Sequence, residues 1–234
     1  MEQHGPHLPV GVDSLLCQSV IDRVCETAPD DLCALLLPLQ PVGKSNEHQA
    51  FPGTLSLSSE TLLRLWLDIG ESVARSGLRK MLLLNSHGGQ VQTLDLVARE
   101  LRVTRKMFVV TASLGAFGPA RELFPEDELR HGIHGGSIET SMMLHLHPEL
   151  VRKDKLSEFV STSREIEKDY RYLRPEGSAI SFGWQIQDLH PAGACGNALD
   201  SDAQRGARLV NGAAAGVIEL LREISRYPLA ALRD

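Results

Sequence analysis

The chain has 234 residues, of which 42% are hydrophobic and 23% charged, and its formal net charge is −6 at pH 7. These values are typical of one globular domain with a substantial core, and an acidic chain of this kind lacks the basic face that nucleic acid would need. The sequence contains neither an apolar run long enough to cross a membrane nor a signal-peptide pattern, and its four cysteines have no Cys-x-x-Cys spacing. We therefore expect a cytoplasmic protein with reduced thiols and no membrane or nucleic-acid partner.

The first half of the chain alternates helix and strand patterns. Apolar residues at helical spacing predict a helix over residues 13–26, and a short continuous apolar run predicts a buried strand over 33–39. A long loop over 43–57 follows. Ser58 then provides N-cap chemistry for a helix that ends near Gly77.

The alternation continues to the C-terminus. We expect strands over 79–85 and 107–112, and helices over 91–103, 138–146 and 201–224, with a polar and loop-rich segment over 148–200. Alternating strands and helices predict an α/β fold with a largely parallel sheet and helices on both faces.

The first thirteen residues combine two carboxylates and two imidazoles in a stretch punctuated by glycine and proline. Glu2 and His4 are two residues apart, so in an extended segment both point to the same side, and Asp13 can fold back toward them. Carboxylate oxygen with imidazole nitrogen suits Zn, Mn or Fe. The alternative is a frayed polar terminus with no ligand role.

A second cluster follows the predicted strand that ends at Asn85. His87 and the two glycines after it stand in a strand-to-helix loop, where open α/β folds bind their ligands. A glycine-rich turn with an incidental histidine is the competing interpretation.

The third cluster places His134 in a glycine-flanked loop and Glu139 in the first turn of the next helix. There Glu139 is either a helix cap and dipole partner or a metal ligand held rigidly by the helix.

Taken together and in this order, these motifs resemble those of the creatininase (creatinine amidohydrolase) family. The residues that carry the resemblance are Glu2-Gln3-His4-Gly5-Pro6-His7-Leu8-Pro9 with Asp13, His48-Gln49-Ala50-Phe51-Pro52-Gly53-Thr54, Asn85-Ser86-His87-Gly88-Gly89, and His134-Gly135-Gly136 with Glu139-Thr140-Ser141. They cover most of the chain up to Ser141.

The resemblance implies a three-layer α/β/α hydrolase of non-peptide or unusual amide C–N bonds, usually a homo-oligomer such as a hexamer. Two divalent ions (Zn, Mn or Fe) would share a hydroxide that attacks the amide carbonyl. Carried over by position, Glu2, His4 and His87 match metal ligands, Asp13 matches the bridging ligand, and His134 matches the catalytic histidine. A non-catalytic relative that acts as a metal-binding or scaffold protein is the alternative.

Two departures from the family pattern qualify this assignment. Creatininase carries a metal-binding Glu where this chain has Gly89, which argues against creatinine as substrate and suggests that Glu139 completes the second metal site, as in the Gly-Gly branch of the family. Family members also carry a strand before the Glu-Gln-His motif, where this chain has Met1. We therefore expect a single domain over residues 1–234 that lacks its first strand, either because the start codon was assigned too far downstream or because the chain is truncated. If the sequence is complete, we expect Glu2 to stand on an unanchored terminus.

Overall fold

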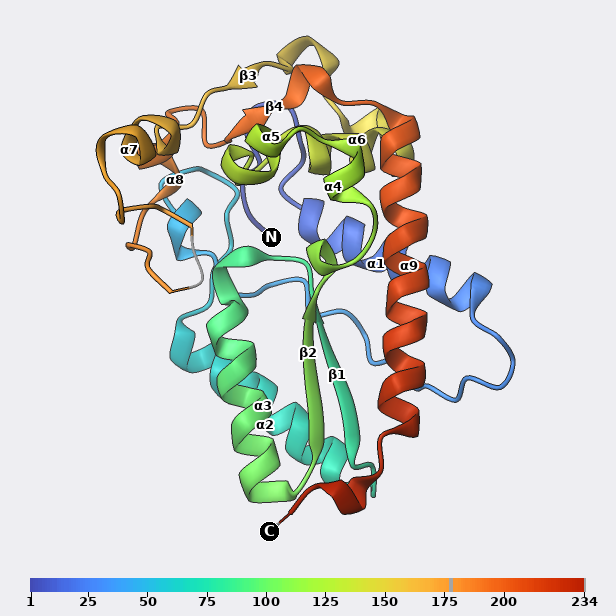
Figure 1. The fold of residues 1–234 in the computed structure, drawn as a ribbon. Coiled ribbons are helices and arrows are strands. Elements are labelled where there is room, and N and C mark those ends of the chain that lie inside the picture. The colour runs from blue at the N-terminus through green and yellow to red at the C-terminus, as the bar shows by residue number, and fades with distance from the viewer. Residues whose placement is uncertain (177–178, 234) are drawn as a thin grey trace.

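A parallel pair of strands forms the centre of the molecule. The computed structural model describes residues 1–176 and 179–233, and in it β1 (Lys80–Asn85) pairs with β2 (Phe108–Ser113) from Lys80 opposite Phe108 to Asn85 opposite Ser113. Helix α3 (Val91–Arg105) connects the two strands, as a parallel pair requires. Figure 1 shows the strands side by side, between helices on either side.

Helices α2 (Ser59–Arg75) and α3 cover one face of this pair. Met81, Leu83 and Val109 project to that side and pack against the fully buried Val97 and Leu101 of α3. Ser58 caps α2 as predicted, because its side chain accepts a hydrogen bond from the backbone N–H of Thr61.

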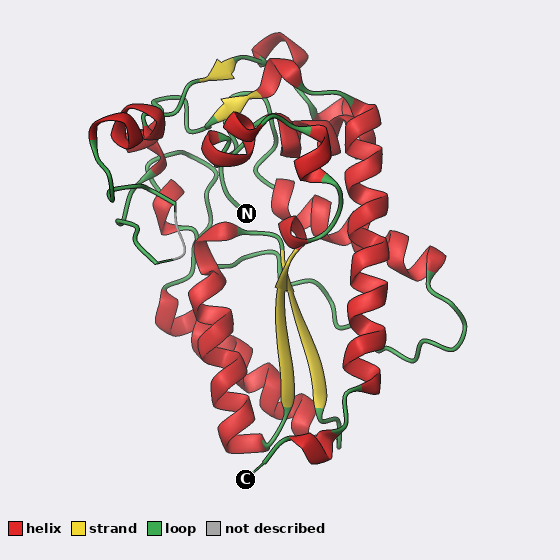
Figure 2. Cartoon of the chain, viewed as in Figure 1, coloured by secondary structure: helices red, strands yellow, loops and turns green. Residues whose placement is uncertain are grey.

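The opposite face packs against α1 (Val12–Thr27) and the long α9 (Ala203–Arg226), which also cover α6 (Ser137–Leu146). Leu82 and Leu84 alternate with Met81 and Leu83 along β1 and belong to the core that these helices form. The result is a three-layer α/β/α arrangement, visible in Figure 2, so the expected fold class is confirmed.

Most of the smaller elements lie beyond the carboxyl ends of the central strands, whereas η7 (Leu229–Ala231) lies at the opposite end, beside the C-terminus (Figure 1). Strand β3 (Glu158–Phe159) pairs antiparallel with β4 (Gly196–Asn197). The remaining short elements are η1 (Asn46–His48), η2 (Gly88–Gln90), η3 (Leu114–Ala116), α4 (Ala120–Leu123), α5 (Glu126–His131), η4 (Pro148–Leu150), η5 (Lys153–Lys155), α7 (Ser163–Asp169), α8 (Ile186–Leu189) and η6 (Ala198–Asp200).

The prediction of a strand over residues 33–39 is wrong. The segment is not part of a sheet, and Leu35, Leu36 and Leu37 expose 83%, 52% and 57% of their surface. An apolar run becomes a buried strand only where a neighbouring strand edge accepts its backbone hydrogen bonds. Within the described residues β1 pairs with β2 alone, so this segment lies outside the sheet.

Among the helices of the described residues, none has the length and apolar character needed to cross a membrane.

Candidate metal centre

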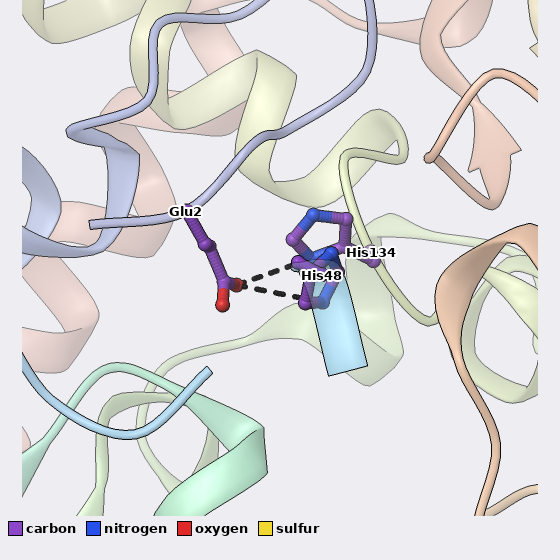
Figure 3. A group of neighbouring side chains, drawn as sticks. All are labelled: Glu2, His48 and His134. Atoms are coloured by element: carbon purple, nitrogen blue, oxygen red, sulfur yellow. Dashed lines mark ion pairs between the residues drawn. The ribbon is translucent and has the colours of Figure 1, made fainter. Parts of the chain in front are cut away.

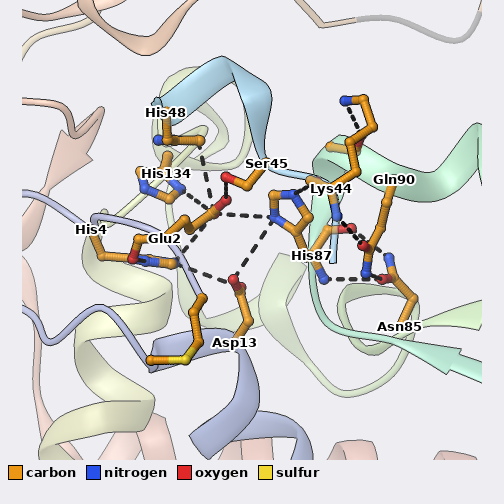
Figure 4. Close-up of polar contacts among 12 residues, drawn as sticks. Glu2, His4, Asp13, Lys44, Ser45, His48, Asn85, His87, Gln90 and His134 are labelled. Carbon is orange, nitrogen blue, oxygen red and sulfur yellow. Dashed lines mark hydrogen bonds and ion pairs between the residues drawn. The ribbon is translucent and has the colours of Figure 1, made fainter. Parts of the chain in front are cut away.

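Six predicted site residues gather beyond the carboxyl end of β1. Glu2 and His4 come from the N-terminal segment, Asp13 from the first turn of α1, and His87 from the loop after β1. His134 and Glu139 lie just before and within the first turn of α6 and complete the set. Figure 4 shows how the labelled members point toward one another.

The Glu2 carboxylate lies at the centre of this cluster and is only 1% exposed. Its Oε1 atom is 3.1 Å from Nδ1 of His87, 3.5 Å from Nδ1 of His134 and 3.8 Å from Nε2 of His4. A fourth imidazole, His48, places its Nε2 at 3.8 Å from the same oxygen. Figure 3 shows His48 and His134 facing this carboxylate, whose other oxygen accepts a hydrogen bond from the Ser45 hydroxyl.

The expectation that Glu2 stands on an unanchored terminus is wrong. Its backbone N–H donates to the carbonyl of Val10 at 2.9 Å, and the Met1 carbonyl accepts from Leu55 N–H at 3.1 Å. The terminal ammonium donates to the Pro41 carbonyl at 2.9 Å, away from the Glu2 side chain. These bonds hold the extended segment against the 41–55 loop, so the backbone that carries Glu2 and His4 is fixed.

Asp13 stands between two imidazoles. Its Oδ1 atom is 3.6 Å from Nε2 of His4, and its Oδ2 atom is 3.8 Å from Nδ1 of His87. Oε2 of Glu139 lies 3.9 Å from the same Nε2 of His4. Asp13 thus lies near both imidazoles, with Glu2 close to His87 and Glu139 close to His4, and Glu2 Oε1 is also 3.8 Å from His4 Nε2.

This donor set fits a cation. The Nδ1 atom of His4 bonds to the Glu2 carbonyl at 3.0 Å, whereas its buried Nε2 has no hydrogen-bond partner among the described residues although carboxylate oxygens surround it. Zinc binds nitrogen and oxygen at about 2.0–2.2 Å, so two ligands of one ion are separated by about 3–3.5 Å. The separations of 3.6–3.9 Å around His4 are too long for hydrogen bonds and close to that value.

Electrostatics in the cluster also favour positive charge. Burial opposes a charge on His4, but Asp13, Glu139 and Glu2 outweigh it and raise the pKa of His4 to about 9. Burial likewise opposes a charge on His87, but Glu2, Glu47 and Asp13 raise its pKa to about 11. Burial alone would raise the pKa of Glu2, yet the facing histidines hold it well below its usual range. A buried site that keeps protons on imidazoles this strongly is a site that a metal ion can occupy in their place.

His134 differs from these two imidazoles. Its Nε2 lies 2.7 Å from the Gln3 carbonyl and its backbone pairs with that of Cys195, which fixes the ring. A carbonyl only accepts, so Nε2 carries the proton and Nδ1 turns its lone pair toward Glu2. Burial and the nearby His4 charge lower the pKa of His134, so it is neutral at pH 7.

Two members of the cluster were missed by the sequence analysis. His48 was noted only within the His-x-x-Phe-Pro-Gly-Thr segment, and Glu47 was not noted at all. Both lie on η1, a single turn inside the 43–57 loop, and the motif beside them was the available signal. His7, by contrast, is turned away: its Nε2 bonds to the Thr140 hydroxyl at 3.0 Å and its ring stacks on Phe159.

Comparison with known proteins agrees with the layout. A family model described as "Creatininase: Creatinine amidohydrolase" matches residues 1–221. A creatinine amidohydrolase from Pseudomonas putida is 38% identical over 172 residues, which are 67% of this chain and 65% of that protein. A mycofactocin precursor peptide peptidase from Mycobacterium ulcerans (strain Agy99) is 35% identical over 161 residues, which are 67% of this chain and 59% of that protein. The chain thus spans about six-tenths of the length of these curated relatives.

Solved structures extend the likeness over nearly the whole chain. A zinc–zinc form of a creatininase mutant superposes with a TM-score of 0.72 at 30% identity, covering 95% of this chain and 86% of that one. A manganese form of creatininase gives a TM-score of 0.68 at 29% identity over the same shares of each chain.

Proposed function

The chain belongs to the creatininase family, and from that premise we propose that it is a metal-dependent hydrolase of an amide C–N bond. The observation that carries the proposal is the place of Asp13 between His4 and His87, with one carboxylate oxygen toward each. A carboxylate so placed suits two neighbouring cations that share one ligand. Both curated relatives have names that describe hydrolysis of an amide bond.

We assign the proposed ligands to two ions. Glu2 and His87 would hold one divalent ion, His4 and Glu139 the second, and Asp13 would bridge the two. The zinc and manganese forms of the neighbouring creatininase structures make these two metals the first to test. Two divalent ions at this place would polarise the amide carbonyl and make water acidic enough to attack near pH 7.

The chain's own acid–base group in this scheme is His134. Because Nε2 donates to Gln3, the ring works through Nδ1, which faces the cluster. Neutral at the outset, Nδ1 accepts a proton from the attacking water and then delivers it to the departing nitrogen. The Gln3 carbonyl holds the ring in place through both transfers and favours its positively charged form.

The access side of the cluster is at Glu139. Its side chain is 26% exposed, whereas those of Glu2, His4, Asp13, His87 and His134 are each 10% exposed or less. A substrate would therefore enter beside Glu139, with its carbonyl oxygen directed toward the cations proposed beside Asp13. We further propose that the substrate is a linear amide or formamide, because the metal-binding Glu of creatininase is replaced here by Gly89.

Metal analysis tests the proposal directly. Protein stripped with chelator and then loaded separately with Zn²⁺ or Mn²⁺ is expected to retain two ions per chain and to hydrolyse at least one amide of a formamide and peptide panel. One ion or none per chain, with no hydrolysis, would support the non-catalytic alternative. Light scattering of the loaded protein tests the predicted homo-oligomer separately.

A further inference from the structure

His87 has a second polar neighbourhood on the side that faces away from Glu2. Its Nε2 lies 2.9 Å from the carbonyl of Lys44 and 3.1 Å from Oε1 of Glu47. Both are acceptors, so Nε2 keeps its proton and Nδ1 is the atom left for Glu2 and Asp13. The Nε2–H bond is directed to the carbonyl, and Oε1 of Glu47 receives no aligned hydrogen bond. Glu47 therefore acts on His87 through its charge.

The Glu47 carboxylate is itself held in place. Nζ of Lys44 lies 3.3 Å from its Oε2 and donates to the Gly89 carbonyl at 2.9 Å. This lysine ties η1 to the loop after β1, which carries His87. With its side chain only 11% exposed, Glu47 keeps a buried charge beside that loop.

Gly89 is the third part of this arrangement. A Cβ at position 89 would lie 1.7 Å from Oε1 of Glu47 and 2.6 Å from Nε2 of His87. The missing side chain is therefore the condition for Glu47 to reach His87. The glycine at position 89, which departs from the family pattern, leaves the space that the Glu47 carboxylate occupies beside His87.

We propose that Glu47 is a positioning residue whose charge stabilises the Nε2–H form of His87, which donates to the Lys44 carbonyl, and so strengthens Nδ1 as a metal ligand, and that Gly89 is required to admit it. Outer-shell partners of a metal-binding histidine raise its basicity, and their loss weakens metal binding about 10–100-fold. The inference rests on the proposed role of His87 as a ligand.

The test compares Glu47→Gln with the wild type, using Zn²⁺ alone as the probe. Glu47→Gln keeps the volume and removes the charge, so we expect two zinc ions per chain still to bind, with affinity for the His87 ion reduced about 10–100-fold in chelator competition. We also expect the ¹⁵N spectrum of the zinc-loaded variant to show a changed His87 Nε2 resonance. Glu71→Gln is the matched control, because Glu71 also pairs at 3.1 Å with a basic side chain, Arg105, away from the centre.

A double-mutant cycle with Gly89→Ala tests the packing half of the inference. The added methyl group must displace both the Glu47 carboxylate and the His87 ring, so Gly89→Ala alone should weaken zinc at least as much as Glu47→Gln does, and adding Glu47→Gln to it should cost little more. Unchanged affinity in Glu47→Gln, or fully additive losses, would overturn the inference. The loss of one whole zinc equivalent would also overturn it, because Glu47 would then be a direct ligand. Failure of the wild type to bind zinc would instead refute the proposed function.

Discussion

The Nε2 atom of His134 lies 2.7 Å from the carbonyl oxygen of Gln3, a residue next to two proposed ligands in sequence. The same short N-terminal segment therefore supplies Glu2 and His4 to the centre and orients the proposed acid–base group. Because Gln3, and not a proposed ligand, holds the His134 ring, the loss of His134 and the loss of a metal ligand should have different effects, and these effects can be measured.

We expect Asp13→Ala and His134→Ala to fail in different ways. Removing Asp13 deletes the carboxylate between His4 and His87, so metal content should fall below two ions per chain and activity should be lost. Removing His134 should leave metal content unchanged and lower kcat about 10²–10⁴-fold, the contribution of a general acid–base group. Elemental analysis with steady-state kinetics decides between them, and loss of both ions in His134→Ala would make His134 a ligand.

The stability of the metal-free protein should depend on pH with a maximum near pH 6.5. His4 and His87, with pKa values raised to about 9 and about 11, contribute stability that is present below pH 6.5 and is lost as the pH rises toward those values. His7 and His48, with pKa values lowered to about 4 and about 3, contribute stability that is present above pH 6.5 and is lost as the pH falls.

Thermal unfolding from pH 5 to pH 9, with chelator or with Zn²⁺, checks this dependence. If His4 and His87 are ligands as proposed, bound metal would take the place of their protons, so zinc should flatten the alkaline side of the profile. Stability of the chelated protein that rises steadily from pH 7 to pH 9 would contradict the assignment.

The sequence was informative where chemistry and spacing are local. Asp13, His87 and Glu139 each stand at the beginning of a helix or the end of a strand, and the topology of an α/β fold brings such positions together. Glu47 was not predicted because its part in the site depends on empty space at Gly89, which is 42 residues away in sequence and adjacent only after folding. The strand over 33–39 failed for a similar reason, since an apolar run does not show whether a pairing edge exists.

Glu128 lies outside the candidate metal centre and bonds to the backbone of two segments, so its removal should destabilise the fold. This carboxylate is 4% exposed and accepts hydrogen bonds from the backbone N–H groups of Ser137 at 2.6 Å and Asn197 at 2.8 Å. Glu128→Ala leaves both donors without that partner, and we expect it to lower the free energy of unfolding by about 2–4 kcal/mol. Glu126→Ala, an exposed change on the same helix, should stay within about 0.5 kcal/mol in the same urea titration. Equal changes in the free energy of unfolding of the two variants would show that the Glu128 hydrogen bonds do not stabilise the fold.

Substrate preference follows from the place of Gly89. The family resemblance implies a metal-binding Glu at this position in creatininase, whereas here the Glu47 carboxylate occupies the space of a Cβ and Glu139, on α6, is the ligand proposed for the second ion. We therefore expect the proposed site to hold its substrate in a different orientation. A cyclic substrate fitted to the first geometry should then lose productive contact, because placement within about 0.5 Å decides such discrimination. Steady-state hydrolysis by protein loaded with Zn²⁺ or Mn²⁺ should show creatinine to be a poor substrate beside linear formamides and small peptides. A kcat/KM for creatinine above about 10⁴ M⁻¹s⁻¹, the low end for ordinary enzymes, would refute the preference.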